Sequence, residues 1–191
     1  MYCFLAGQWL RKINNPPETD GGPYLYMFNH VSMFDQFMIG AYVGHYITAV
    51  AAIETFRYPI FGFILKKYGI IPIVRQKIKK AIVSLKVAEK AIKQGTSFLI
   101  SPEGTRTLTG EIGPFKKGPF HLAKNTNATI VPIALKGGFR AKRKNDWRLQ
   151  PGILTVVFGD PISSANYKEL DIKELRNLIS KKIIELKKGS Q

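Results

Sequence analysis

Short apolar runs that alternate with helical patterns are the feature that most constrains the fold of this chain. Six runs have the length and composition of β-strands: 24–28, 47–51, 70–74, 97–101, 129–135 and 153–158. Several are apolar at nearly every position, which is typical of strands that are covered on both faces. The alternation predicts an α/β fold in which helices flank a central mixed, largely parallel sheet.

The helical patterns lie between these runs. Apolar residues recur at three- and four-residue steps over 78–92, with lysines on the opposite face and Gly95 as the expected stop. A last helix is expected to begin at Asp171, because Glu174 stands three residues later, as in a capping box. Over 56–74 the pattern predicts a helix followed by a strand.

Chain length and hydropathy favour one domain over 1–191. The 191 residues are enough to bury a core, and no apolar run reaches the roughly 20 residues that a membrane-spanning helix needs. The first ten residues are apolar and aromatic, but they lack the preceding basic stretch and the cleavage site of a signal peptide. Two interpretations stay open for 1–12: a short anchor at a membrane surface, or an N-terminal helix packed on the core.

The formal net charge of +16 implies an anionic partner, such as nucleic acid, anionic lipid or a phosphorylated substrate. Basic residues are concentrated over 57–93 and 136–148, and 140–152 is expected to be an exposed loop. Cys3 is the single cysteine, which excludes an internal disulfide and a cysteine-rich metal site. The three histidines form no metal-ligand pattern, so no metal is expected.

His30 and Asp35 form the first polar constellation, a His-x4-Asp pattern directly after the 24–28 run. Five positions on a regular helix rotate a side chain by about 500°, so the two diverge by about 140° unless His30 lies in the turn before the helix. One interpretation is structural: Ser32 caps the helix, and Asp35 completes a capping box. The other is catalytic: Asp35 orients a neutral histidine that takes a proton from a hydroxyl. Without a Gly-x-Ser-x-Gly elbow, the nucleophile would be the substrate's own alcohol.

Glu103, Gly104, Thr105 and Arg106 form the second constellation, directly after the 97–101 run. Ligands of α/β sheets gather beyond the carboxyl ends of the strands. Gly104 permits a tight turn, and the guanidinium of Arg106 offers a planar fork suited to phosphate. The alternative is an ordinary turn that carries a solvated arginine.

Together these constellations closely resemble the paired motifs of the acylglycerol-phosphate acyltransferase family. Further blocks match in the family's order: 69–75, which ends in Arg75, then 115–118 with Lys116 and Lys117, then the Val-Pro-Ile run 131–133, and finally 151–162. The resemblance covers about 24–162. Ser101 stands where the family commonly has an aromatic residue, a departure that bears on substrate identity more than on reaction class.

The resemblance implies a glycerol-phosphate acyltransferase-like fold and direct acyl transfer without a cofactor. His30 would deprotonate the hydroxyl of a lysophospholipid acceptor, with Asp35 as its orienting partner. The acceptor would then attack the thioester of acyl-CoA or acyl-carrier protein, the co-substrate. With 1-acylglycerol 3-phosphate as the preferred acceptor, the product is phosphatidic acid.

Substrate-binding positions also follow from the resemblance. Arg75 and Arg106 would hold the acceptor phosphate, and Glu103 would position Arg106 or a glycerol hydroxyl, within the segment that includes Gly104 and Thr105. Lys116 or Lys117 would bind phosphate or stabilise the oxyanion.

Lipid substrates and the positive charge predict peripheral or monotopic attachment to an anionic membrane surface, on the cytoplasmic face where thioester donors are found. Three other acceptors stay open: glycerol 3-phosphate, another lysophospholipid and a lyso-aminolipid. A nucleic-acid-binding protein is the alternative from another class. It is disfavoured, because the aromatic residues over 56–63 lie in apolar runs that suit lipid.

Overall fold

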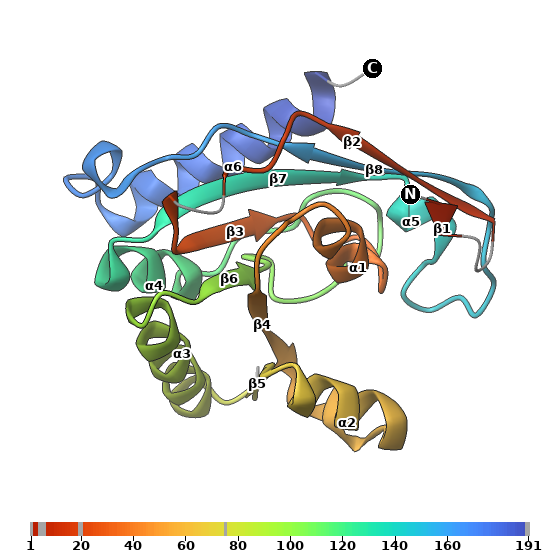
Figure 1. Ribbon diagram of the computed structural model, residues 1–191, viewed down its shortest axis with the longest axis horizontal. Helices are drawn as coiled ribbons and strands as arrows, with labels where there is room; N and C mark the ends of the chain where they lie inside the picture. Colours follow the sequence, from red (N-terminus) through yellow and green to blue (C-terminus); the bar gives the residue numbers. More distant parts are fainter. Residues whose placement is uncertain (1, 4–6, 19–20, 75, 190–191) are drawn as a thin grey trace.

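A mixed β-sheet forms the centre of the molecule (Figure 1). The computed structural model describes residues 2–3, 7–18, 21–74 and 76–189. Within them, eight strands lie in the order β1-β2-β8-β7-β3-β6-β4-β5. Adjacent strands are parallel, except for the antiparallel pairs β1–β2 and β7–β8. The strands are β1 (Tyr2–Cys3), β2 (Gln8–Ile13), β3 (Tyr24–Phe28), β4 (Ile47–Ala52), β5 (Ile71–Ile73), β6 (Ser97–Ile100), β7 (Thr129–Lys136) and β8 (Gly152–Phe158).

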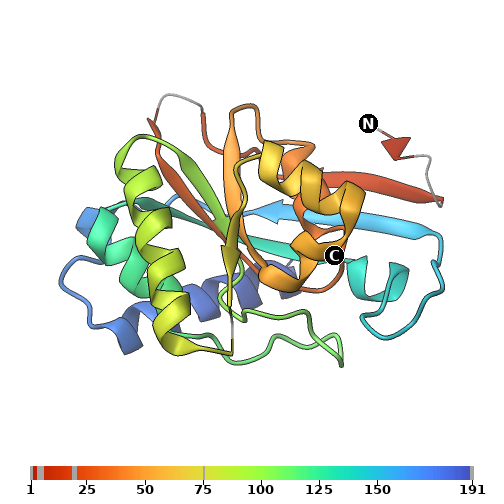
Figure 2. The same cartoon turned by 90° about the horizontal axis from the view of Figure 1, so that it is seen from below.

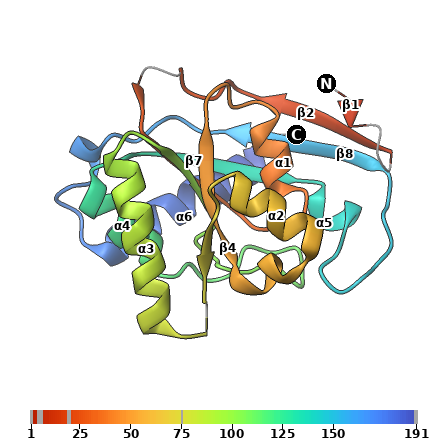
Figure 3. The same ribbon diagram turned by 60° about the horizontal axis from the view of Figure 1, so that its bottom comes forward.

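Helices cover both faces of the sheet, which confirms the predicted α/β fold. α3, α4 and α6 pack on one face, and α1 and α5 pack on the other (Figure 3). α2 lies beyond the edge formed by β5. The helices are α1 (Asp35–Gly40), α2 (Pro59–Lys67), α3 (Ile78–Lys93), α4 (Gly118–Thr126), α5 (Gly138–Ala141) and α6 (Ile172–Gly189), with 3-10 turns at Ile53–Arg57 (η2) and Ser164–Asn166.

The sequence of β3 suits a central strand, because its side chains are buried on both faces of the sheet. All five residues are buried, and successive side chains point to opposite faces. Leu25 and Met27 enter the core under α3, α4 and α6, whereas Tyr24, Tyr26 and Phe28 enter the core under α1 and α5. Because β3 and β6 are parallel neighbours, the loops that follow them emerge at the same edge of the sheet.

The predicted strands are confirmed to within one residue at each end, but the N-terminal segment differs. Residues 8–13 form strand β2, which pairs with β8 through Trp9 and Ile153, so a packed helix is wrong for these residues. Gln8 is buried, while Trp9, Arg11 and Lys12 are exposed. As a strand, this segment forms hydrogen bonds with the backbone of β8 while the charged side chains of Arg11 and Lys12 stay in solvent. Met1 and residues 4–6 lie outside the described residues, and the anchor over 1–12 stays a prediction.

The predicted capping box of the last helix is confirmed by reciprocal hydrogen bonds. Asp171 N–H donates to Glu174 Oε2, and Glu174 N–H donates to Asp171 Oδ1, both at 2.7 Å. The helix and strand expected over 56–74 are α2 and β5. The loop expected over 140–152 is shorter than predicted, because α5 extends to Ala141 and β8 begins at Gly152.

Candidate active site

His30 and Asp35 meet at the carboxyl end of β3. Nδ1 of His30 lies 2.6 Å from Oδ2 of Asp35. The arrangement is the one that the spacing requires, since His30 precedes the helix and Asp35 is the first residue of α1. With a proton on Nδ1 held by the carboxylate, Nε2 is the nitrogen that can accept a proton. The His30 side chain is 17% exposed, so that nitrogen can be reached from outside the core.

The Asp35 carboxylate also organises the turn before α1. It is fully buried, and it accepts hydrogen bonds from Val31 N–H at 2.8 Å and from Ser32 N–H at 3.0 Å. Ser32 is not the N-cap; its Oγ accepts from Phe34 N–H at 2.9 Å, and Phe34 occupies the cap position. Asp35 therefore serves both the turn and His30. Burial raises the pKa of the Asp35 carboxyl, and its hydrogen bonds from His30, Ser32 and Val31 oppose that rise.

Glu103 holds the backbone of His30 from the neighbouring loop. His30 N–H donates to Glu103 Oε1 at 2.7 Å, and Gly113 N–H donates to Oε2 at 2.8 Å. On the other side of the same residue, Thr107 N–H donates to the His30 carbonyl at 2.8 Å. Burial raises the pKa of Glu103, and the bonds from Gly113 and His30 oppose the rise. Both Glu103 oxygens thus contact backbone, and a contact to Arg106 or to a glycerol hydroxyl stays a prediction.

The turn at Gly104 brings Lys116 into the site. Gly104 has φ +70°, and a Cβ there would lie 3.2 Å from the Lys116 side chain, Nζ included. This backbone conformation and this close contact both favour glycine. Lys116 N–H donates to the Pro102 carbonyl at 2.8 Å, which fixes the two loops together. Lys117 is exposed at the start of α4.

Arg106 and Thr105 lie on the same loop. Arg106 is half-buried, and among the described residues its guanidinium has no ion pair or hydrogen bond. Thr105 Oγ1 accepts from Lys144 Nζ at 3.0 Å, so the basic loop after α5 reaches the site. Arg75 lies outside the described residues.

Contacts with β7 and α5 that no sequence pattern indicated support the site. The Asn29 amide binds the backbone of Leu135, with Nδ2 donating at 3.1 Å and Oδ1 accepting at 2.7 Å. A Cβ on Gly138 would lie 2.9 Å from Val31, so α5 packs closely on the turn. The Phe28 ring meets the His30 ring edge-on, with centroids 5.6 Å apart. Asn29 and Leu135 are 106 positions apart, and no local pattern links them.

The described part of the chain contains no cluster of three or more His, Cys, Asp or Glu residues that could hold a metal ion. None of its helices combines the length and the apolar character that crossing a membrane requires.

Comparison with known proteins identifies the family of this chain. The sequence profile of the family named Acyltransferase matches residues 10–136, well over half of the chain. This chain belongs to the acyltransferase family. The predicted family resemblance is thereby confirmed.

Individual family members share most of this chain. It is 34% identical over 186 residues to the 1-acyl-sn-glycerol-3-phosphate acyltransferase of Cocos nucifera, which covers 94% of this chain and 60% of the relative. It is 30% identical over 167 residues to the protein of that name from Pseudomonas aeruginosa, which covers 87% of this chain and 63% of the relative. The chain thus spans less than two thirds of these relatives.

The fold agrees with a crystal structure, that of the 1-acyl-sn-glycerophosphate (LPA) acyltransferase PlsC from Thermotoga maritima. The TM-score is 0.77 over 94% of this chain and 70% of that chain, at 21% sequence identity. At that identity the likeness supports the fold.

Proposed function

We propose that this family member transfers a fatty acyl group from acyl-CoA or acyl-carrier protein to the free hydroxyl of 1-acylglycerol 3-phosphate, which forms phosphatidic acid. The observation that carries the proposal is the 2.6 Å contact between His30 Nδ1 and Asp35 Oδ2. Relatives that bear the name 1-acyl-sn-glycerol-3-phosphate acyltransferase support the choice of acceptor.

The reaction proceeds by direct attack. His30 Nε2 takes the proton of the acceptor hydroxyl as its oxygen bonds to the thioester carbonyl carbon. The buried carboxylate of Asp35 stabilises the imidazolium that forms. When the tetrahedral intermediate collapses, the carbon–sulfur bond breaks, and His30 returns the proton to the departing thiolate.

Basic groups around the pair bind the anionic parts of the substrates. Arg106, with no described partner of its own, contacts the acceptor phosphate together with Arg75. Lys116, whose Nζ lies against the Gly104 turn, supplies positive charge to the phosphate or to the oxyanion, and Lys117 adjoins it. Gly104 and Thr105 form the backbone of this binding segment.

The enzyme works at an anionic membrane surface on the cytoplasmic side, where it is peripheral or monotopic. A lipid acceptor and a lipid product require the site to open near a bilayer. The net charge of +16 favours an anionic surface.

A panel of acceptors with a labelled acyl thioester tests this function. We expect label in phosphatidic acid when 1-acylglycerol 3-phosphate is supplied, and far less with glycerol 3-phosphate, other lysophospholipids or a lyso-aminolipid. His30→Ala should lower the rate by about 10²–10⁴ while the chain stays folded, since this is the usual contribution of a general base. Preferential labelling of another acceptor contradicts the substrate. Near-normal turnover by the His30→Ala variant contradicts the mechanism.

A further inference from the structure

α2 presents apolar side chains to solvent. Ile60 is 80% exposed and Phe63 is 63% exposed, and within α2 only Gly62 is buried. We define the α2 surface as the exposed apolar residues of this helix and its flanks: Tyr58, Ile60, Phe63, Ile64 and Tyr68. Scattered apolar residues are ordinary on protein surfaces, but several on one short helix indicate contact with an apolar partner.

The α2 surface is held firmly outside the core. Gly62 lies so close to η2 that a Cβ would come within 2.3 Å of the Phe56 carbonyl oxygen. At the other end of the helix, Tyr46 Oη donates to the Tyr68 carbonyl at 2.7 Å, and Thr48 Oγ1 donates to the Gly69 carbonyl at 2.9 Å. These bonds join α2 to β4. The exposed side chains therefore belong to an anchored helix, and this helix lies beside β5, the edge strand of the sheet (Figure 2).

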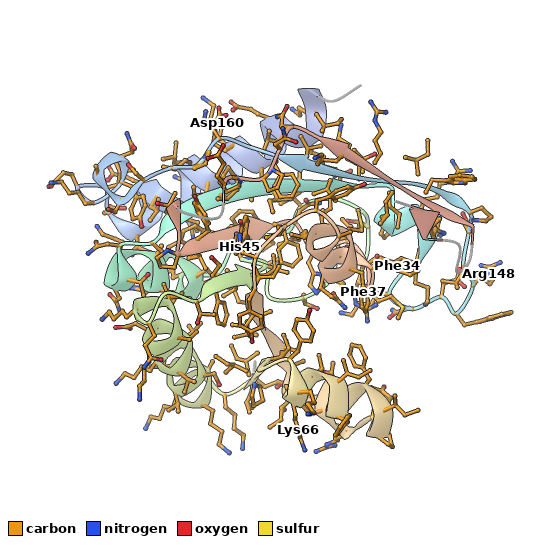
Figure 4. All side chains as sticks on the ribbon, viewed as in Figure 1. Phe34, Phe37, His45, Lys66, Arg148 and Asp160 are labelled. Atoms are coloured by element: carbon orange, nitrogen blue, oxygen red, sulfur yellow. The ribbon has the colours of Figure 1, made fainter. Side chains whose placement is uncertain are left out.

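Positive charge is concentrated at the same end of the molecule. The segment 53–93, which includes α2, β5 and α3, contains ten lysines and arginines against two glutamates, and so carries +8 of the total +16. Lys66 and Lys67 are exposed in the last turn of α2. In Figure 4, Lys66 lies at the bottom of the view and Asp160 at the top. α3 adds exposed apolar residues of its own: Ile82, Val83 and Val87.

We infer that the α2 surface is the part of this chain that docks on an anionic phospholipid bilayer. The inference rests on the proposed lipid acceptor, and it identifies the membrane-facing surface. Apolar side chains enter the boundary between headgroups and acyl chains, while lysines beside them meet the anionic headgroups. Met33 and Phe37, which flank Asp35 in sequence, are also exposed, so the turn and helix that follow His30 present apolar groups to solvent as well.

The positive charge beside the α2 surface favours an anionic bilayer over two other possible partners, a second copy of the chain and the acyl chain of the donor. A second copy of the chain would bring two surfaces of high positive charge together, which opposes association. An acyl chain of the donor would use the apolar groups but has no charge for the lysines to meet. An anionic bilayer satisfies both features.

Matched isoleucine variants test the apolar contribution. The test variant is Ile60→Ser with Ile64→Ser on α2. The control is Ile153→Ser with Ile184→Ser, which are exposed on β8 and α6, two elements drawn in the upper part of Figure 1, whereas α2 is at the bottom. Co-sedimentation uses vesicles of equal parts phosphatidylglycerol and phosphatidylcholine. We expect binding of the test variant to fall about tenfold or more, while the control binds like the wild type. Wild-type binding by the test variant, or an equal loss in the control, overturns the inference.

Matched lysine variants test the electrostatic contribution. Lys66→Gln with Lys67→Gln should weaken binding to these vesicles by about fivefold per lysine and leave binding to pure phosphatidylcholine unchanged. The control is Lys181→Gln with Lys182→Gln, two adjacent exposed lysines of α6. α6 packs on β7, which is four strands away from β5 in the sheet, or about 19 Å at roughly 4.8 Å per strand. That separation exceeds the Debye length of about 8 Å at physiological salt, so the control should bind the vesicles as the wild type does. An equal effect of both pairs shows that the net charge acts without a docking surface, which overturns the inference.

Turnover of a short-chain acceptor dispersed as monomers separates docking from catalysis. The Ile60→Ser/Ile64→Ser variant should match the wild type with this acceptor and lose activity only when the acceptor is embedded in vesicles. An equal loss with the dispersed acceptor assigns α2 to the acyl-chain site instead. A wild-type dimer that the variant dissociates, with vesicle binding unchanged, assigns α2 to a second copy. If the wild type turns over no acceptor at all, the proposed function fails, and the vesicle measurements still decide the docking surface.

Discussion

The backbone N–H of His30 donates a hydrogen bond to Oε1 of Glu103 over 2.7 Å. This bond joins the loop after β3 to the loop after β6, across 73 positions of sequence. Oε2 of the same carboxylate accepts from Gly113 N–H, and the His30 carbonyl accepts from Thr107 N–H. The two loops thus share one backbone framework. Glu103 is in this respect a positioning residue, because it fixes the backbone from which the His30 side chain extends.

Glu103→Gln should disturb this framework. Glutamine keeps one acceptor oxygen but places an amide NH₂ where the second carboxylate oxygen receives a backbone N–H. We expect the free energy of unfolding to fall by about 1–3 kcal/mol, the cost of a buried unsatisfied donor, and kcat to fall with it as His30 loses its position. Urea denaturation and initial rates measure the two effects. Glu169→Gln, at an exposed position, is the control and should change neither; an equally stable, equally active Glu103→Gln variant would contradict the prediction.

The stability difference between wild type and Glu103→Gln should depend on pH. Burial raises the pKa of Glu103 in the folded chain, so the folded chain binds this proton more readily than the unfolded chain. The resulting stabilisation is complete below the unfolded pKa of about 4.3 and is lost as pH rises through the folded pKa. Glutamine does not titrate, so the advantage of the wild type should be largest near pH 4 and smaller at pH 7. A gap that widens as pH rises would show that hydrogen bonding to the carboxylate outweighs burial.

Local sequence signals predicted much of the fold and the centre of the site. β3 was predictable because all five of its residues are apolar, as burial on both faces requires. The start of α6 was predictable because Asp171 and Glu174 interact within one turn. His30 and Asp35 are five positions apart, so helix geometry alone limits how they can meet.

Contacts between distant segments left no such signal. The bond from Lys144 to Thr105 and the bond from Asn29 to Leu135 join residues far apart in the chain, and their side chains have no local spacing that reveals a partner. β2 was missed for a different reason: a short apolar run is compatible with a helix, an anchor or a strand until its partner is known. That partner is β8, which begins 139 positions after β2 ends at Ile13.

Asp35→Asn should separate catalysis from the turn that Asp35 organises. Asparagine keeps one oxygen for the backbone N–H groups of Val31 and Ser32, and it removes a buried charge. We therefore expect a change in the free energy of unfolding below about 2 kcal/mol. An amide NH₂ that donates to Nδ1 of His30 leaves the imidazole proton on Nε2, the nitrogen that must accept the proton of the acceptor, and the neutral amide cannot stabilise the imidazolium. We therefore expect kcat to fall by about 10³–10⁴. Thermal denaturation and single-turnover rates measure both quantities, and a stable variant with full activity would leave Asp35 as a residue of the turn alone.

Arg106→Lys should raise the KM for the acceptor about tenfold, because lysine retains the charge but loses the planar fork that binds phosphate through two hydrogen bonds. The KM for the acyl donor should change little, since the proposal assigns this guanidinium to the acceptor. Arg75→Lys should act in the same way, as the family resemblance implies. Arg176→Lys, a half-buried position on α6, is the matched control and should leave both constants unchanged. Initial rates with each substrate varied in turn decide the matter: if the donor KM rises instead, Arg106 binds the phosphates of the donor, and the acceptor phosphate contacts other cations.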